Sequence, residues 1–260
     1  SVDFSPDGTK LASASEDGTV KIWNSATGAL ITNITGHTNI VSCVAWSTDG
    51  KLASGSWDYT VKIWDASTYA LLDTFSNSNN PVNSLDWSPN GTLIAVGHNG
   101  EGDYAGTGGT PTGAPSQHFN VTLWNITTKT PHYLGQHTNS VTSVAFSADG
   151  KILASSSIDA SVMVWNATSG TYLNTIYATG AANAVAWGPN NTLASGLVNG
   201  IINVYAAPAL NSSISKSIAG HLGGVMSLDW QTSRDRLASG SADATAEIRV
   251  GSTGAFAAGS

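Results

Sequence analysis

A short apolar segment that ends in an aromatic residue recurs six times along the chain. It reads SVDF, CVAW, SLDW, SVAF, AVAW and SLDW, and its aromatic residues follow one another at intervals of about 41 residues, except for one interval of 59. Self-similarity at this period indicates a repeat protein in which each repeat is one structural unit. This constrains the fold more strongly than the length of 260 residues, which alone would allow one or two domains.

Each repeat shows the pattern of four short strands. In the first repeat we expect strands over residues 1–4, 10–15, 19–23 and 29–34. The Asp and Gly of the SPDG segment tolerate the backbone of a tight turn, and TVKIW alternates apolar and polar residues with the period of a strand. No helical periodicity competes over a comparable length.

A four-stranded sheet with two apolar faces cannot bury itself, but sheets stacked radially around an axis bury both faces. We therefore expect an all-β fold, a β-propeller of four-stranded antiparallel blades with six repeats visible. Either six blades close on themselves, or a seventh blade lies outside this segment. We expect one WD-repeat type domain over residues 1–260, with an inserted loop at about 100–118, in the third repeat.

The second repeat carries the most specific pattern, GHTNIVSCVAWSTDGKLASGSWDYTVKIWD. Its Gly-His pair, its LASGS strand, its turn Asp and its closing Trp-Asp pair resemble the WD-40 repeat β-propeller family, and the resemblance covers nearly the whole chain. It implies that a His, a Ser, an Asp and a Trp form a hydrogen-bonded tetrad inside a blade. Such a tetrad makes physical sense, since a buried Asp needs donors and an indole N–H needs an acceptor.

The resemblance places complete tetrads in the second and fourth repeats and partial ones in two others. The complete sets are His37, Ser54, Asp58 and Trp64, and His137, Ser155, Asp159 and Trp165. The partial sets are Ser13, Asp17 and Trp23 in the first repeat, and His221, Ser239 and Asp243 in the sixth. Arg249 stands at the Trp position of the sixth repeat, Asn199 and Tyr205 stand at the Asp and Trp positions of the fifth, and the third keeps only Trp124.

The resemblance to the WD-40 repeat family implies that partners bind where the loops after the second strands meet the loops before the first strands. The positions beside the tetrads would then point outward and form an apolar ring with few charges, of the kind that marks contact surfaces. The expected partner-binding residues are Trp57, Ile40, Ser42, Asn83, Thr142, Ile158, Val185, Val198 and Met226. The alternative is that a neighbouring loop covers Trp57.

These features predict a non-catalytic scaffold that binds a protein or peptide partner on the propeller rim. A structural subunit of an extracellular polymer or surface layer is the alternative, and it makes self-association possible. A propeller hydrolase is a third class, but the His-Ser-Asp combination recurs at the repeat period, which a single catalytic site would not do. The sequence also holds only three Glu residues for paired carboxylates, so we expect no catalytic residues.

Composition excludes several other classes. Only 10% of residues are charged, the formal net charge is -7, and no basic stripe occurs, so we expect no nucleic-acid partner. No apolar run approaches the roughly 18 residues of a membrane span, so we expect no membrane insertion. We expect no cofactor and no metal, although Glu101 and Asp103 leave a weak calcium hypothesis. The low charge and many hydroxyl residues fit an extracellular or surface protein, with the cytoplasm as the alternative.

Overall fold

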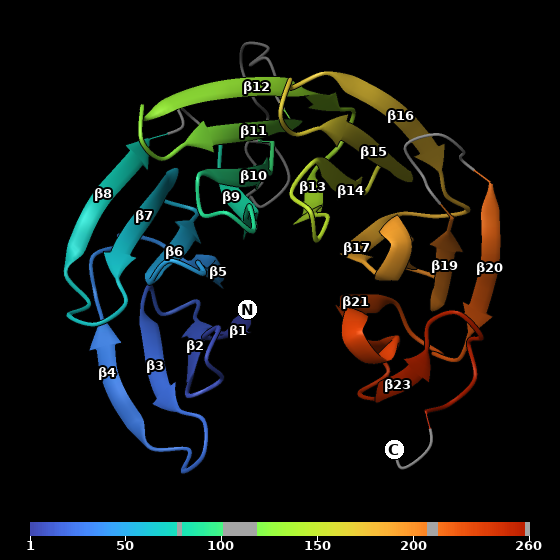
Figure 1. Cartoon of the computed structure of the whole chain (residues 1–260), viewed down its shortest axis with the longest axis horizontal. Coiled ribbons are helices and arrows are strands. Elements are labelled where there is room, and N and C mark those ends of the chain that lie inside the picture. Colours follow the sequence, from blue (N-terminus) through green and yellow to red (C-terminus); the bar gives the residue numbers. More distant parts are fainter. Residues whose placement is uncertain (77–79, 101–118, 207–212, 258–260) are drawn as a thin grey trace, which may run out of the picture. The chain divides into compact units, whose positions relative to one another are not determined.

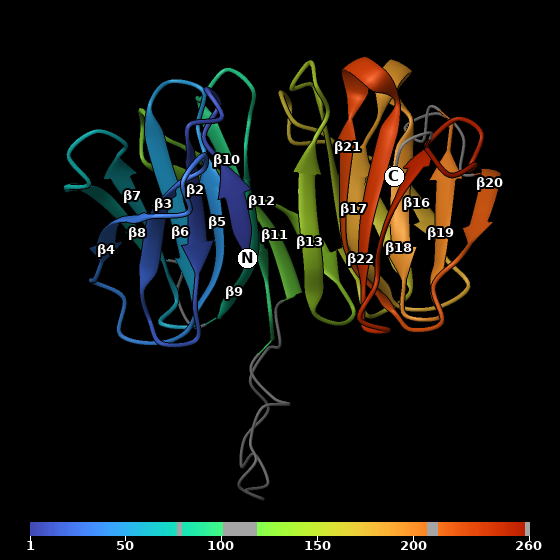
Figure 2. The ribbon, with the colours of Figure 1, turned by 90° about the horizontal axis from the view of Figure 1, so that it is seen from below.

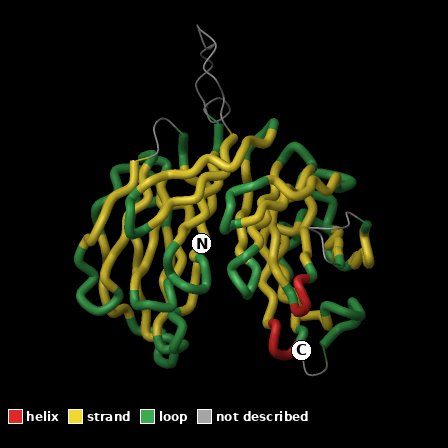
Figure 3. The backbone as a smooth tube through the Cα atoms, turned by 45° about the horizontal axis from the view of Figure 1, so that its top comes forward, coloured by secondary structure: helices red, strands yellow, loops and turns green. Residues whose placement is uncertain are grey.

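The computed structural model describes residues 1–76, 80–100, 119–206 and 213–257. Within these residues the regular structure is almost entirely β-strand, with two short 3-10 helices over Pro189–Asn191 and Thr232–Arg234 (Figure 3). The chain divides into two compact units, Ser1–His132 and Tyr133–Ser260, and each is described by itself.

The first unit contains three antiparallel sheets, named blades 1, 2 and 3, and each sheet follows the order of the chain. Blade 1 consists of β1 (Val2–Phe4), β2 (Lys10–Ala14), β3 (Val20–Asn24) and β4 (Leu30–Ile34). Blade 2 consists of β5 (Val41–Trp46), β6 (Lys51–Ser56), β7 (Thr60–Asp65) and β8 (Leu71–Ser76). Blade 3 consists of β9 (Val82–Trp87), β10 (Leu93–His98), β11 (Phe119–Asn125) and β12 (Thr130–His137), and the division between the units falls within β12.

The second unit contains blades 4, 5 and 6. Blade 4 consists of β13 (Val141–Phe146), β14 (Ile152–Ser157), β15 (Ser161–Asn166) and β16 (Tyr172–Tyr177). Blade 5 consists of β17 (Ala182–Trp187), β18 (Leu193–Leu197), β19 (Ile201–Tyr205) and β20 (Ile214–Ala219). Blade 6 consists of β21 (Val225–Gln231), β22 (Arg236–Ser241) and β23 (Ala246–Val250).

The expected fold class, an all-β propeller of antiparallel blades, is confirmed. Blade 6 departs from the expected four strands, because its described part has three strands and one isolated bridge from Arg249 to Phe256. Within each unit the first strands of neighbouring blades contact one another, as β5 and β9 do. The fourth strand of a blade forms the opposite edge of its sheet (Figure 1). The hairpin turns of each unit gather at two opposite ends of its strands (Figure 2).

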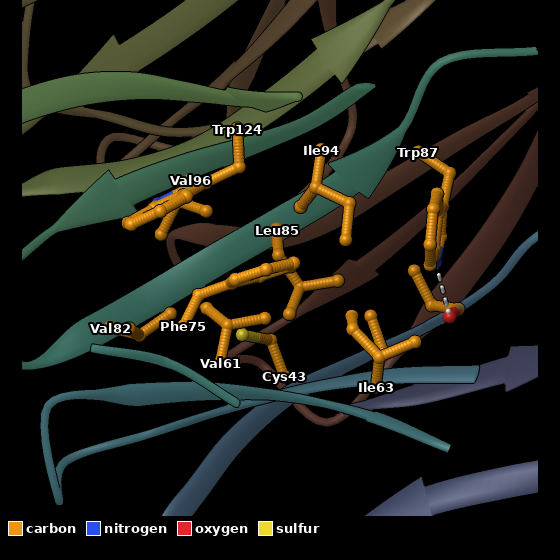
Figure 4. Packing of buried hydrophobic residues seen from close by; sticks show 12 residues of the cluster. Cys43, Val61, Ile63, Phe75, Val82, Leu85, Trp87, Ile94, Val96 and Trp124 are labelled. Carbon is orange, nitrogen blue, oxygen red and sulfur yellow. Dashed lines mark hydrogen bonds between the residues drawn. The ribbon is translucent and has the colours of Figure 1, made fainter. Parts of the chain in front are cut away.

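Apolar side chains fill the space between neighbouring blades. Between blades 2 and 3, Cys43, Val61 and Ile63 pack against Val82 and other side chains of the next blade (Figure 4). The small residues of the second strand allow this close approach: a Cβ atom on Gly55 would lie 2.4 Å from the Val82 Cγ1 atom. The small-residue strand is therefore a packing requirement of the stacked sheets.

The aromatic residue that closes the first strand also joins a blade to the one before it. The indole Nε1–H of Trp87 donates to the Ala45 carbonyl oxygen at 3.0 Å, the bond drawn in Figure 4. Equivalent bonds join Trp46 to the Asp3 carbonyl at 3.1 Å and Trp187 to the Ala145 carbonyl at 2.9 Å. In these three blades the feature that revealed the repeats in the sequence is thus an inter-blade hydrogen bond, whereas Phe146 carries no donor and Trp230 donates to Asp235 of its own blade at 3.1 Å.

Candidate functional site

In blade 2 the four tetrad side chains form one continuous hydrogen-bonded chain. His37 Nδ1 lies 2.8 Å from an Asp58 oxygen, and His37 Nε2 lies 2.8 Å from the Ser54 hydroxyl. Because the carboxylate can only accept, Nδ1 carries the proton and Nε2 accepts from Ser54. The Ser54 oxygen in turn accepts the Trp64 indole N–H at 2.8 Å. Every polar group in this chain has a partner, so the neutral imidazole is the form that the site holds.

The pKa values of this pair follow from burial and hydrogen bonding. Burial lowers the pKa of His37, and the nearby Asp58 offsets only part of this effect. Burial alone would raise the pKa of Asp58, but hydrogen bonds from Thr60, the Thr38 backbone N–H and His37 outweigh it and lower that pKa. The two lowered pKa values therefore favour an ionised Asp58 beside a neutral His37.

The fourth and sixth blades contain the same His-Ser-Asp arrangement. His137 contacts Asp159 at 3.1 Å and Ser155 at 2.8 Å, and the Trp165 indole reaches Ser155 at 3.4 Å. His221 contacts Asp243 at 3.2 Å and Ser239 at 2.8 Å.

Arg249 replaces the tryptophan of blade 6 and makes different contacts. Its Nε donates to Glu247 at 2.7 Å and its Nη1 donates to the Gly254 carbonyl at 2.9 Å. The guanidinium lies 4.1 Å from the centre of the Phe256 ring. This arginine therefore ties β23 to the chain that follows it, a role that the sequence pattern did not reveal.

Blades 1 and 5 retain only the serine-to-aromatic part of the arrangement. Trp23 donates to Ser13 at 2.9 Å, while Asp17 bonds to Thr19 rather than to a histidine. In blade 5, Ser195 and the Tyr205 hydroxyl lie 3.1 Å apart.

Blade 3 lacks even the serine. Val96 occupies its place in β10, and the Trp124 indole nitrogen has no hydrogen-bond partner among the described residues.

At the rim, one backbone hydrogen bond recurs and brings the expected loops together. Trp57 N donates to Ile40 O at 2.9 Å, and Ile158 N donates to Ser140 O at 3.1 Å. Equivalent bonds join Asn99 to Pro81, Val198 to Ala181 and Ala242 to Gly224. The loop after each second strand and the loop before the first strand therefore lie side by side in blades 2 to 6.

Three of the expected partner-binding residues are open to solvent. Ile158 is 47% exposed, Val198 53% and Met226 59%, and all three belong to the second unit. Trp57, Ile40 and Asn83, in the first unit, are half-buried.

The expectation for Val185 is wrong. Val185 is 4% exposed and packs in the core between blades 4 and 5. The position that Ser42 and Thr142 occupy, four residues before the closing aromatic residue of the first strand, belongs in blade 5 to Asn183 and not to Val185. The β-bulge of this strand recurs in blades 2, 4 and 6, so the register is the same in all four blades.

Ser42 and Thr142 are half-buried and serve a contact between blades. The Ser42 hydroxyl donates to the Val82 carbonyl at 2.5 Å, and the Thr142 hydroxyl donates to the Ala182 carbonyl at 2.6 Å. Asn183 makes the equivalent bond to the Val225 carbonyl at 3.0 Å. Their polar atoms are therefore directed to the next blade, and this use competes with a role in partner binding.

Sequence reasoning missed two exposed residues at the same rim. Leu222, directly after the tetrad His221, is 99% exposed. Tyr59, directly after the tetrad Asp58, is exposed and has a φ of 69°. Both are apolar or aromatic neighbours of tetrad residues, and that adjacency was the available signal.

Among the residues that the structure describes, no group of three or more His, Cys, Asp or Glu side chains could hold a metal ion. The inserted loop, with Glu101 and Asp103 of the calcium hypothesis, lies outside the described residues, between β10 and β11. None of the described helices is both long and apolar enough to span a membrane.

Comparison with known proteins points to one family. A family model described as WD domain, G-beta repeat, matches residues 1–24, 28–65, 70–103, 128–166 and 212–248. Periodic tryptophan protein 2 homolog from Caenorhabditis elegans is 41% identical over 49 residues, which are 19% of this chain and 5% of that protein. Protein Notchless from Drosophila melanogaster is 49% identical over 45 residues, which are 17% of this chain and 9% of that protein. The similarity to each relative thus covers about one repeat of the chain and under a tenth of the relative's own length.

Proposed function

The chain belongs to the WD domain, G-beta repeat family, and we propose that it is a non-catalytic scaffold that binds a protein or peptide partner on its rim loops. The rim loops are the paired loops that carry Trp57 in the first unit and Val198 in the second.

The observation that carries this proposal is a set of exposed apolar side chains on the rim of the second unit. Ile158, Val198, Met226 and Leu222 come from three successive blades, and each is more than 40% exposed. The rim loops of blades 5 and 6 are in contact, because a Cβ atom on Gly224 would lie 3.0 Å from the Val198 carbonyl oxygen. The loops that carry Ile158, Val198 and Leu222 hold no Lys or Arg, and neither does strand β21, which carries Met226. An apolar patch of this kind favours a protein contact over solvent.

The tetrad histidines support the non-catalytic reading. His37, His137 and His221 each use one ring nitrogen on an Asp and the other on a Ser. In each case the serine hydroxyl is nearly or fully buried, so it is not placed to attack a substrate.

The proposal is tested by affinity capture from the native source with quantitative mass spectrometry. Trp57→Asp places a charge on the rim of the first unit and Val198→Asp one on the rim of the second, and we expect at least one of them to reduce capture of a partner about tenfold or more. Leu72→Asp places the same charge on the exposed fourth strand of blade 2 and serves as the matched control. Unchanged capture by both rim variants, with all variants folded, would show that the partner binds elsewhere.

A structural role through self-association has its own support. A β-bulge at the start of the fourth strand leaves two successive apolar side chains exposed, Leu30 and Ile31 in blade 1 and Leu71 and Leu72 in blade 2. Sedimentation velocity at increasing concentration tests this role. A single monomeric species at all concentrations would rule it out, and assembly that Leu72→Asp abolishes would support it.

A further inference from the structure

We propose that the rim of the first unit binds a lysine or arginine side chain of the partner, with Glu16 as the opposite charge and Trp57 as the aromatic surface. This inference rests on the proposed function and names the chemistry that its partner must offer. The site, here named the Glu16 site, consists of Glu16, Ile40, Trp57 and Tyr59.

A chain of backbone hydrogen bonds brings these residues together from two blades. Ser15 O in blade 1 accepts from Val41 N at 3.1 Å, and Ile40 O accepts from Trp57 N at 2.9 Å. Glu16 directly follows Ser15 in the sequence, and Ile40 directly precedes Val41. Glu16 and Trp57 therefore flank Ile40 on its two sides.

The charges around the site favour a cation. The rim loops at residues 15–19, 35–41 and 56–60 contain Glu16, Asp17 and Asp58 but no Lys or Arg. Asp58 is used by the tetrad, and Asp17 bonds to Thr19 and lies 3.6 Å from Lys21 Nζ. Glu16 is exposed and, among the described residues, makes no hydrogen bond or ion pair. It is thus the carboxylate of this rim that remains to be neutralised.

The opposite end of the same blades shows a different arrangement. There Asp49 forms an ion pair with Lys51, and Asp7 is held by Ser5 and Thr9 close to Lys10. Asp65 also lies at that end, so three carboxylates there share the two lysines Lys10 and Lys51, whereas Glu16 at the rim has no basic residue beside it in the loops. The asymmetry is the reason for placing a cationic partner at the rim.

The apolar part of the site selects the shape of that cation. Trp57 is half-buried and Tyr59 is exposed, so ring surface is available for a cation, which aromatic rings attract by about 0.5–2 kcal/mol in general. The half-buried Ile40 between Glu16 and Trp57 offers contact for an aliphatic stem. Lysine and arginine combine such a stem with a positive end. An acidic side chain of the partner at this place would be repelled by Glu16, and a purely apolar one would remove water from the Glu16 carboxylate without replacing it.

A peptide array tests the inference directly. The array carries nonapeptides with degenerate flanks and a fixed central arginine, lysine, citrulline, leucine or glutamate, and the intact labelled chain is the probe. Citrulline keeps the shape of arginine without its charge. We expect the wild-type chain to bind peptides with central arginine about tenfold more strongly than those with citrulline. In Glu16→Gln the ratio of arginine to citrulline binding should fall close to one. Trp57→Ala should bind all five peptide sets more weakly.

Asp7→Asn is the matched control, since it removes one exposed carboxylate from the opposite end of blade 1 and should retain the preference. Circular dichroism melting confirms that each variant is folded. A preference that survives in Glu16→Gln, or its absence in the wild-type chain, would overturn the Glu16 site. If peptides bind without regard to the central charge but lose binding with Trp57→Asp, the Glu16 site is wrong and rim binding stands. If Trp57→Asp leaves peptide binding unchanged as well, the proposed use of this rim fails too.

Discussion

Blades 2 and 3 place a tryptophan at the same position of the third strand but surround it differently. In blade 2, Trp64 pairs with Leu52 across the sheet and donates its indole N–H to Ser54. In blade 3, Trp124 pairs with Ile94, and Val96 stands where the serine would be.

The two blades therefore reach a similar architecture by different means. Trp124 stacks on Phe75 of blade 2, with 4.9 Å between ring centroids and an interplanar angle of 13°. Phe75 and Trp124 belong to the core between the two blades (Figure 4). Packing across the blade boundary replaces the polar chain inside the blade, although the buried Trp124 indole N–H has no acceptor within the described part of the chain. The tetrad is thus one way to fix a blade and not a condition for forming one.

The largest expected effect is the loss of the aromatic contact. Phe75→Ala removes a buried ring, and we expect it to lower the free energy of unfolding by about 3–5 kcal/mol. Ile34→Ala removes the equivalent side chain of blade 1, which shares a core cluster with Trp64 but has no aromatic ring to stack, and should cost about 1 kcal/mol less. Urea unfolding followed by near-ultraviolet circular dichroism measures both. Equal losses would mean that the stack gives blade 3 no special support.

The next effect concerns acid pH. Burial lowers the pKa of His98, in blade 3, to about 4, while the unfolded chain keeps a histidine pKa of about 6.5. Between these two pKa values the unfolded state binds a proton that the folded state does not. The free energy of unfolding therefore has its full value above pH 6.5 and falls by about 3 kcal/mol as the pH drops to 4. His37 in blade 2 has a lowered pKa and acts in the same direction. Unfolding free energies at pH 7 and pH 5 should differ less in His98→Gln than in the wild-type chain, and an unchanged difference would contradict this assignment.

A smaller effect is expected from the polar chain of blade 2. Ser54→Ala leaves the Trp64 indole without its acceptor and His37 without its donor, and we expect a loss of about 2 kcal/mol. Ser13→Ala in blade 1 breaks only the bond from Trp23 and should cost about half as much. If thermal melting shows the same shift for both variants, the histidine adds nothing to the serine contact.

The smallest effect tests the unpaired indole of blade 3. Val96→Thr offers a hydroxyl to Trp124 while keeping a branched side chain. The substitution should be about 1 kcal/mol more favourable in the wild-type chain than in a Trp124→Phe background, where no indole N–H is present. A double-mutant cycle measures this difference, and a coupling energy of zero would mean that the two groups do not meet.

The fold could be predicted from the sequence because its determinants are local and repeated. The aromatic residues at a period near 41, the SPDG-type turns and the alternating third strands each indicate a four-stranded unit. The spacing of Ser54, Asp58 and Trp64 is also local, since all three lie on one hairpin. The structure brings these side chains together with His37, as the resemblance implied.

The rim could be predicted only in part, because its details depend on contacts between blades. Val185 was misplaced because it lies two residues before Trp187, whereas the rim position lies four residues before the closing aromatic residue, where β17 has Asn183. That interval is visible in the sequence. Ser42 and Thr142 were expected to face a partner, but their acceptors are backbone carbonyls of the next blade, which carry no sequence signature. The stack of Phe75 on Trp124 likewise joins residues of different repeats.

The indole bond from one blade to the previous one has a consequence for how such chains grow. Trp46, Trp87 and Trp187 supply the donor, and the acceptor is a main-chain oxygen that any residue possesses. A duplicated repeat therefore brings its own indole donor, and the preceding repeat needs no side-chain change to accept the hydrogen bond. We therefore expect a duplicated repeat to keep this bond, with side-chain differences such as those of blades 3 and 6 added to it.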